Sequence, residues 1–145
     1  MTTDQSVPAQ PTPLSEQEER QWAMIAHWSV LLNLITGILG PVVPLLLYLV
    51  YKDRSRYVAY QSLQALIFQL IWWVGAGVIT GIAWTAVGLL SAVLIGLICI
   101  PFACIISALP LVAIVYGIIA GVQTSQGQDF KYWLIGDWVR STYTG

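Results

Sequence analysis

Histidine and cysteine are two residue types that could bind a metal ion or attack a substrate, and both are rare in this chain. The chain has one histidine, His27, and two cysteines, Cys99 and Cys104. A metal site needs about three or four ligands, and a redox dithiol needs the closer C-x-x-C spacing. A lone histidine can sense pH, but it more often bonds a backbone carbonyl or reaches toward the membrane interface. We therefore predict no catalytic residue, no metal ligand and no bound cofactor.

Amide and hydroxyl side chains form a second group that could do chemistry. Four of them lie close together in the sequence: Gln61, Ser62, Gln64 and Gln69. At 100° per residue, these four fall within an arc of about 160° on one face of a helix. Lipid cannot satisfy amides, so this face should turn toward protein or a water-filled cavity. Asn33 and Thr36 are candidate partners. We favour hydrogen bonding between helices over a polar path, because no charged residue accompanies the group.

Small residues recur four apart in three runs. The runs are Gly77, Gly81 and Thr85; Gly88, Ala92 and Gly96; and Ala113, Gly117 and Gly121. Such stripes allow close approach of helix backbones, within one chain or between chains. They predict tight helix packing and leave self-association open.

Charge is too scarce and too uneven for a soluble domain. Charged residues make up 9% of the chain and apolar residues 57%, whereas soluble domains carry about 25% charge. Asp, Glu, Lys and Arg are absent from residues 21–51 and again from 57–128. Because about 20 apolar residues cross the hydrocarbon core, we predict an all-α, polytopic membrane helix bundle with three to four membrane-embedded segments.

The first half of the chain divides at its turn residues. Residues 1–15 are polar and rich in proline, which predicts a disordered tail. Ser15 and Glu18 have the spacing of a capping box, so a helix should begin near residue 16 and continue to about 36. After Gly40 and Pro41, a short second helix is expected over 41–51. It is too short to span alone, so residues 22–51 either cross once or fold back.

The second half of the chain should hold two long helices, or three shorter ones. The basic loop 52–56 and the basic residues Lys131 and Arg140 lie on one side of the membrane only if an even number of spans separates them. The positive-inside rule therefore favours two helices, at about 57–84 and 88–123, and places loop 52–56 and the C-terminus in the cytoplasm. Residues 129–145 alternate charge with aromatic residues, and Phe130, Leu134 and Trp138 predict an amphipathic interfacial segment.

A series of short motifs resembles a bacterial family of small membrane proteins of unknown function. The motifs are Ala26-His27-Trp28, Gly40-Pro41, Lys52-Asp53, Gln64-Ala65-Leu66-Ile67-Phe68-Gln69, and Gly127 followed by Phe130-Lys131-Tyr132. That family is grouped with the Tic-type subunits of the chloroplast inner-envelope import machinery. The resemblance covers about residues 16–135 and implies a helical membrane bundle. It does not imply protein translocation, because function resides in sites rather than folds.

These observations favour a non-enzymatic protein of the cell membrane. We expect a scaffold, assembly factor or accessory subunit whose partners are the lipid bilayer and either further copies of itself or a larger membrane complex. The alternative is a channel or translocon-like component with a path lined by glutamines. A net charge of −1 argues against binding to nucleic acid, which requires a basic surface.

Overall fold

The computed structural model describes residues 12–144, and all regular elements in this range are helical. Most of the tail predicted over 1–15 therefore lies outside the described residues. The helices are α1 (Glu16–Trp28), α2 (Leu32–Thr36), α3 (Val42–Tyr51), α4 (Arg56–Gln69), α5 (Gly75–Ser91), α6 (Ile95–Ser107), α7 (Leu109–Ser125) and α8 (Gly136–Thr144). A 3₁₀ turn, η1 (Ser29–Leu31), joins α1 to α2, and a π-helical turn, η2 (Leu70–Val74), joins α4 to α5.

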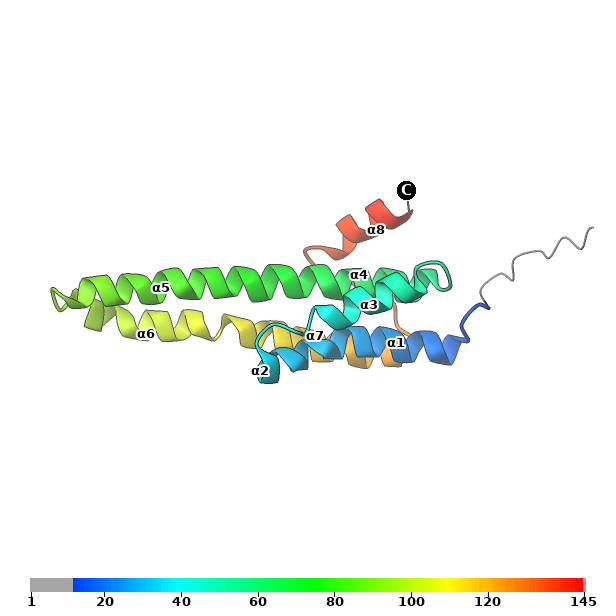
Figure 1. The fold of residues 1–145 in the computed structure, drawn as a ribbon, viewed down its shortest axis with the longest axis horizontal. Helices are drawn as coiled ribbons and strands as arrows, with labels where there is room; N and C mark the ends of the chain where they lie inside the picture. The colour runs from blue at the N-terminus through cyan, green and yellow to red at the C-terminus, as the bar shows by residue number, and fades with distance from the viewer. Residues whose placement is uncertain (1–11, 145) are drawn as a thin grey trace, which may run out of the picture.

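Two long rods form the frame of the molecule. Helices α4, η2 and α5 run as one rod over Arg56–Ser91, and α6 and α7 return beside it over Ile95–Ser125 (Figure 1). Both rods are long and apolar enough to cross a bilayer, yet only 22% and 17% of their most apolar windows are buried within the protein. A core helix of a soluble protein would be mostly covered by its own chain. Two candidate spans are fewer than the predicted three to four embedded segments, because α3 is only 10 residues long.

The turn between the rods lies at residues 92–94, not at the predicted break near 84–88. Leu94 adopts a left-handed conformation, with φ of 62°, and α6 begins directly after it. This position is close to the middle of the uncharged run 57–128. A central turn gives two arms of similar length, and it brings both charged ends of the run to the same end of the hairpin. Gly88, which suggested the earlier break, lies inside α5.

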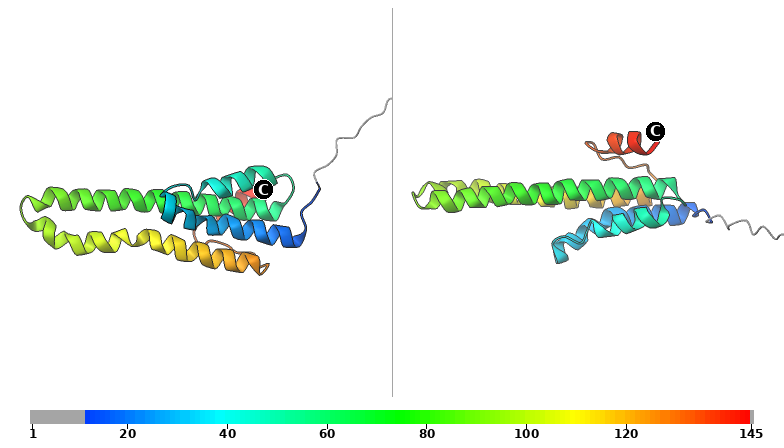
Figure 2. Two further views of the ribbon diagram at one scale, coloured as in Figure 1. Left: turned by 60° about the horizontal axis from the view of Figure 1, so that its bottom comes forward. Right: turned by 45° about the horizontal axis from the view of Figure 1, so that its top comes forward.

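Residues 22–51 fold back on themselves. The capping box predicted for α1 is confirmed, since the Ser15 hydroxyl accepts from the Glu18 amide and the Ser15 amide donates to the Glu18 carboxylate. Gly37, at φ of 81°, ends α2, and Pro41 caps the start of α3. Helix α3 then returns alongside α1 and α4 (Figure 2). Neither arm of this N-terminal hairpin crosses the full length of the long rods.

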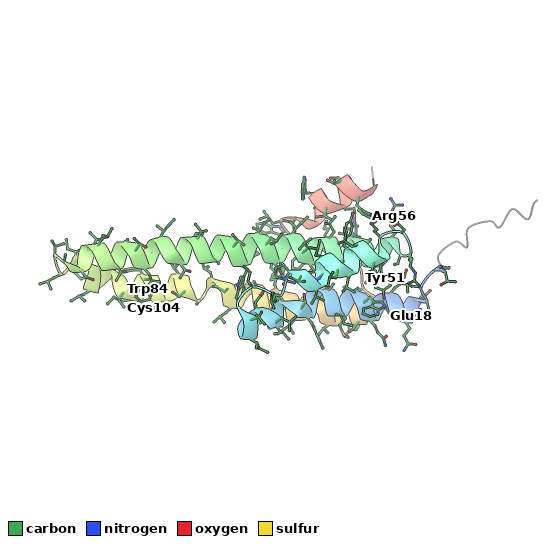
Figure 3. The ribbon with its side chains drawn as sticks, viewed as in Figure 1. Glu18, Tyr51, Arg56, Trp84 and Cys104 are labelled. Carbon is green, nitrogen blue, oxygen red and sulfur yellow. The ribbon has the colours of Figure 1, made fainter. Side chains whose placement is uncertain are left out.

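Charged residues collect at one end of the molecule. Figure 3 places Glu18, Tyr51 and Arg56 there, whereas Trp84 and Cys104 lie in the opposite half of the hairpin. Hydrogen bonds join the chain segments at this charged end: Ser55 Oγ to Glu19 Oε1 at 2.5 Å, Tyr57 Oη to the Gln128 carbonyl at 3.1 Å, and Tyr143 Oη to the Lys52 carbonyl at 3.4 Å. The opposite end, around residues 89–98, carries no charged side chain.

The C-terminal segment 129–144 packs against α4. Helix α8 runs obliquely along the rods, on the side of α4 away from α1 (Figure 1). The predicted apolar stripe is divided between two faces: Phe130 is buried, whereas Leu134 and Trp138 are exposed. The inward side chains are instead Tyr132, Ile135 and Val139. The segment is therefore bound to the bundle through one face and presents a second apolar face outward.

Candidate functional site: a buried polar network beneath the C-terminal segment

The glutamine face of α4 is completely covered by protein. Gln61 and Gln64 have no exposed surface, and Gln69 is 2% exposed. Helix geometry divides the three side chains between two neighbours. Gln61 and Gln64 face the C-terminal segment, and Gln69 faces α1. The face predicted from spacing is therefore a packed interface, and the amide groups of all three glutamines donate hydrogen bonds to protein.

Gln61 and Gln64 bind the backbone of residues 130–132 much as a neighbouring strand would. The Gln64 amide group donates to the Phe130 carbonyl at 3.1 Å, and its oxygen accepts from the Tyr132 amide at 3.1 Å. The Gln61 amide group donates to the same Phe130 carbonyl and to Asp129 Oδ1, both at 3.1 Å. Because the segment is irregular here, these side chains satisfy backbone groups that would otherwise be buried without partners.

His27 completes the network from the α1 side. Its Nε2 lies 3.0 Å from Gln61 Oε1, and its Nδ1 lies 3.0 Å from the Tyr132 hydroxyl. The Gln61 amide group is committed to two acceptors, so Gln61 presents only its oxygen to the imidazole, and Nε2 must carry the proton. Nδ1 is then the acceptor of the Tyr132 hydroxyl. Burial raises the pKa of the Tyr132 phenol, which keeps this hydroxyl protonated and able to donate.

Aromatic rings enclose the network on its apolar side. The rings of Phe68 and Tyr132 stack at 3.9 Å between centroids, and Phe130 meets Tyr132 edge-on at 4.8 Å. Tyr116 of α7 stacks on Tyr132 at 5.8 Å. Such ring pairs add roughly 0.5–1.5 kcal/mol each beyond the burial of their area. Tyr132 is thus fixed by its ring, its hydroxyl and its backbone amide together.

Ion pairs hold the outer edge of the same segment. Arg140 pairs with Asp129 and lies over the Tyr60 ring at 5.0 Å, while Lys131 Nζ lies 2.6 Å from Asp137 Oδ1. The Asp129 contact raises the pKa of the Arg140 guanidinium. These groups are partly exposed, so each pair contributes only about 0–1 kcal/mol. The buried amides and rings therefore dominate the attachment of the segment.

A second polar cluster joins the N-terminal hairpin to α4. The Gln69 amide group donates to Ser29 Oγ at 3.0 Å, and Asn33 Oδ1 accepts from the Gly40 amide at 2.8 Å. A Cβ on Gly40 would lie 2.5 Å from Asn33 Nδ2 and 2.6 Å from Gln69 Oε1. Only glycine therefore allows the hairpin turn to approach α4 this closely. Thr36, the other predicted partner of the glutamine face, instead bonds to the Leu32 carbonyl.

The network joins the C-terminal segment to the bundle, and His27 is part of it. Both nitrogens of His27 are engaged and its side chain is fully buried. Within residues 12–144, no group of three or more His, Cys, Asp or Glu side chains could hold a metal ion. Cys99 and Cys104 are unpaired thiols on α6.

Spacing identified the glutamine face but missed the partners of that face. His27 bonds to Gln61 and Tyr132, not to a backbone carbonyl, and an acidic residue, Asp129, does accompany the glutamines. Phe130 and Tyr132 lie more than 60 residues away along the chain, so local periodicity could not place them. The sequence signal that could have done so is the Phe130-Lys131-Tyr132 motif at the start of the amphipathic tail.

The space around each glycine shows which helix faces pack within the chain and which face outward. A Cβ on Gly117 would lie 2.6 Å from Val30 Cγ1, and one on Gly121 would overlap the Trp28 ring. These two glycines let α7 pack against α1. On α5, by contrast, Gly77 and Gly81 have nothing within 4 Å of a Cβ position. The first of the three small-residue runs therefore faces away from the chain.

A comparison with known protein families assigns the chain to one of them. A sequence model of the magnetosome magnetite crystal formation protein family, MamF/MmsF, matches residues 18–139. The chain belongs to this family. The match covers both long rods, the N-terminal hairpin and every member of the buried network. No curated protein and no solved structure matches the chain.

Membership of the MamF/MmsF family confirms part of the expected relationship. The chain was expected to resemble a family of small bacterial membrane proteins, and the MamF/MmsF match with its two apolar rods agrees with membrane association. The match gives no support to a grouping with Tic-type import subunits.

Proposed function

We propose that this protein is a non-enzymatic assembly factor or accessory subunit that takes part in magnetite crystal formation from within the magnetosome membrane. The observation that carries the proposal is the family match over residues 18–139. It is joined to a fold in which His27 is bonded within the buried network and the two thiols, Cys99 and Cys104, lie apart from it on α6. The role that suits such a fold is to organise other membrane components.

The acidic side chains support an indirect role in crystal formation. Carboxylates are the groups that would bind iron ions or a mineral surface, and five of the six in residues 12–144 have a partner within the chain. The pairs are Glu16 with Arg20, Glu18 with Ser15, Glu19 with Ser55, Asp129 with Arg140, and Asp137 with Lys131. The run 57–128, which includes the opposite end of the hairpin, has no charged residue. Most of the described carboxylates are therefore already engaged by the chain's own side chains.

The outward face of α5 supports association with another membrane helix. Val78, Gly81, Ile82 and Thr85 line a shallow groove on this helix, and Gly77 continues the small-residue face toward η2. Without a Cβ at these glycines, a second helix can approach its backbone closely. We propose that further copies of this chain, or another membrane subunit, pack here.

The membrane arrangement proposed for this role has four embedded segments. The two long rods cross the bilayer, and the N-terminal hairpin of α1–α2 and α3 enters it from one side and returns. Both ends of the described chain then lie with loop 52–56 on one side, which the basic residues assign to the cytoplasm. The channel alternative receives no support, since Gln61, Gln64 and Gln69 are packed against protein.

Purification from native membranes in a mild detergent tests the assembly role. Mass determination of the purified material should reveal either a stoichiometric membrane partner or a defined homo-oligomer. A strain that lacks the gene should form crystals of altered size or number, and the intact gene should restore them. Normal crystals in the deletion strain, or a purified chain that is always a lone monomer, would rule out the proposed role.

A further inference from the structure

An apolar cavity lies where the C-terminal segment meets the two long rods. Its volume is about 130 Å³. Phe68, Ile71 and Trp72 form one wall, Val112 and Tyr116 form the second, and residues 132–135 form the third. The cavity shares Tyr132 with the polar network, but His27, Gln61 and Gln64 do not line it.

Irregular backbone shapes two of the three walls. Ile71 and Trp72 belong to the π-helical turn η2, a feature that widens a helix locally and recurs at functional sites. Residues 132–135 are held in place by the bonds that Gln64 and His27 make to Tyr132. The cavity is therefore preformed rather than a loose gap between mobile helices.

The chemistry of the walls excludes water as the natural occupant. Apolar cavities of about 150 Å³ remain dry and bind small hydrocarbons such as benzene. A water molecule needs two to four polar partners, whereas the Tyr132 hydroxyl is already engaged with His27. Hydrocarbon of a few methylene groups fits both the size and the surface of this cavity.

The position of the cavity identifies the source of that hydrocarbon. Two of its walls belong to the rods Arg56–Ser91 and Ile95–Ser125, which are long and apolar enough to cross a bilayer. At the third wall, Trp133 is 84% and Leu134 70% exposed, and both are residue types that enter a bilayer readily. We propose that this cavity binds one acyl chain of a membrane phospholipid.

A bound acyl chain would join the C-terminal segment to the membrane as well as to the bundle. One end of the lipid tail would contact Trp72 and Tyr116 on the rods, and its exposed length would lie beside Trp133. The segment would then be fixed by protein contacts on its inner face and by a specific lipid on its side. This role does not depend on the function proposed above.

Native mass spectrometry of the detergent-purified chain tests the proposal. Loosely associated lipids are removed by detergent exchange, so the parent protein should retain one phospholipid per chain. Val112→Trp fills the cavity and should lower retention about tenfold, the effect expected when about two methylene groups lose their buried contacts. Val115→Trp adds the same bulk to the same helix at a residue that does not line the cavity and should retain the lipid as the parent does.

A second variant and a labelling experiment complete the test. Ile135→Phe fills the cavity from its third wall, and it should reproduce the loss if Val112→Trp proves too unstable to purify. A phospholipid that carries a photoreactive group near the end of its tail should label residues 68–72 or 132–135 of the parent in preference to α6. The proposal is wrong if the parent retains no lipid, if it retains a free fatty acid instead, or if Val112→Trp and Val115→Trp behave alike.

Discussion

Replacing Gln64 with leucine should release the C-terminal segment from α4. The side chain makes two bonds to the backbone of this segment, and the Tyr132 amide has no other partner among the hydrogen bonds of the described residues. The Phe130 carbonyl keeps its bond from Gln61. One buried amide is therefore left unpaired, at a cost of about 1–3 kcal/mol. A middle value of about 2 kcal/mol corresponds to roughly a thirtyfold increase in local opening.

Hydrogen–deuterium exchange in detergent measures this opening directly. Amides of residues 130–139 should exchange roughly thirty times faster in Gln64→Leu than in the parent, because exchange follows the equilibrium of local opening. Peptides from α5 and α6 should not change. Gln126→Leu is the matched control, since Gln126 is exposed at the end of α7 and its loss should alter neither region. If the exchange rate of residues 130–139 rises less than threefold, or rises equally in the control, then the bonds from Gln64 do not hold the C-terminal segment.

Three further predictions concern the glycine faces and the start of α1. Gly117→Leu should destabilise the fold by about 1–3 kcal/mol through overpacking against Val30, visible as a lower melting temperature; an unchanged melting temperature would contradict the α1–α7 packing. Gly81→Leu should leave the melting temperature unchanged but weaken self-association or partner retention in mild detergent. An unaltered complex would show that α5 is not the contact face. The bonds from the Ser15 amide and hydroxyl lower the pKa of Glu18, so the stability it gives α1 is present above its ordinary pKa and lost as pH falls through the lowered value. Helix content of α1, followed by exchange or circular dichroism, should drop at low pH in the parent, and Ser15→Ala should weaken that dependence, since it removes the hydroxyl bond and keeps the backbone amide bond; identical pH profiles would count against the capping box.

The fold was predictable where local chemistry alone decides the structure. Ser15 and Glu18 located the start of α1, Gly40 and Pro41 separated the first predicted helix from α3, and the basic residues that flank the run 57–128 favoured two long helices over three shorter ones. The turn at 92–94 was not predictable from turn residues, because it contains no glycine or proline. Its position follows instead from the need for arms of equal length, which is a property of the whole hairpin.

The candidate site was only half visible in the sequence. The arc of glutamines on α4 indicated that something polar must cover it, and lipid could be excluded as that cover. The actual cover is a tail segment whose Phe130 and Tyr132 lie far along the chain. That pairing depends on the hairpin returning α7 to the start of α4, so it could be read only after the topology was known. The π-helical turn η2 likewise has no signature in residues 70–74 that local propensity would reveal.

The length of the long rods has a consequence for the surrounding lipid. Rod Arg56–Ser91 has 36 residues, which at 1.5 Å per residue amounts to about 54 Å, whereas the hydrocarbon core of a bilayer is about 30 Å thick. Even at a tilt of about 40°, the upper end of the usual range, the rod still extends through about 40 Å. The rod is therefore longer than the hydrocarbon core, and its α4 end carries polar side chains that the C-terminal segment covers. A bilayer that surrounds the apolar η2 and α5 would leave this α4 end, together with loop 52–56, among the headgroups or beyond them.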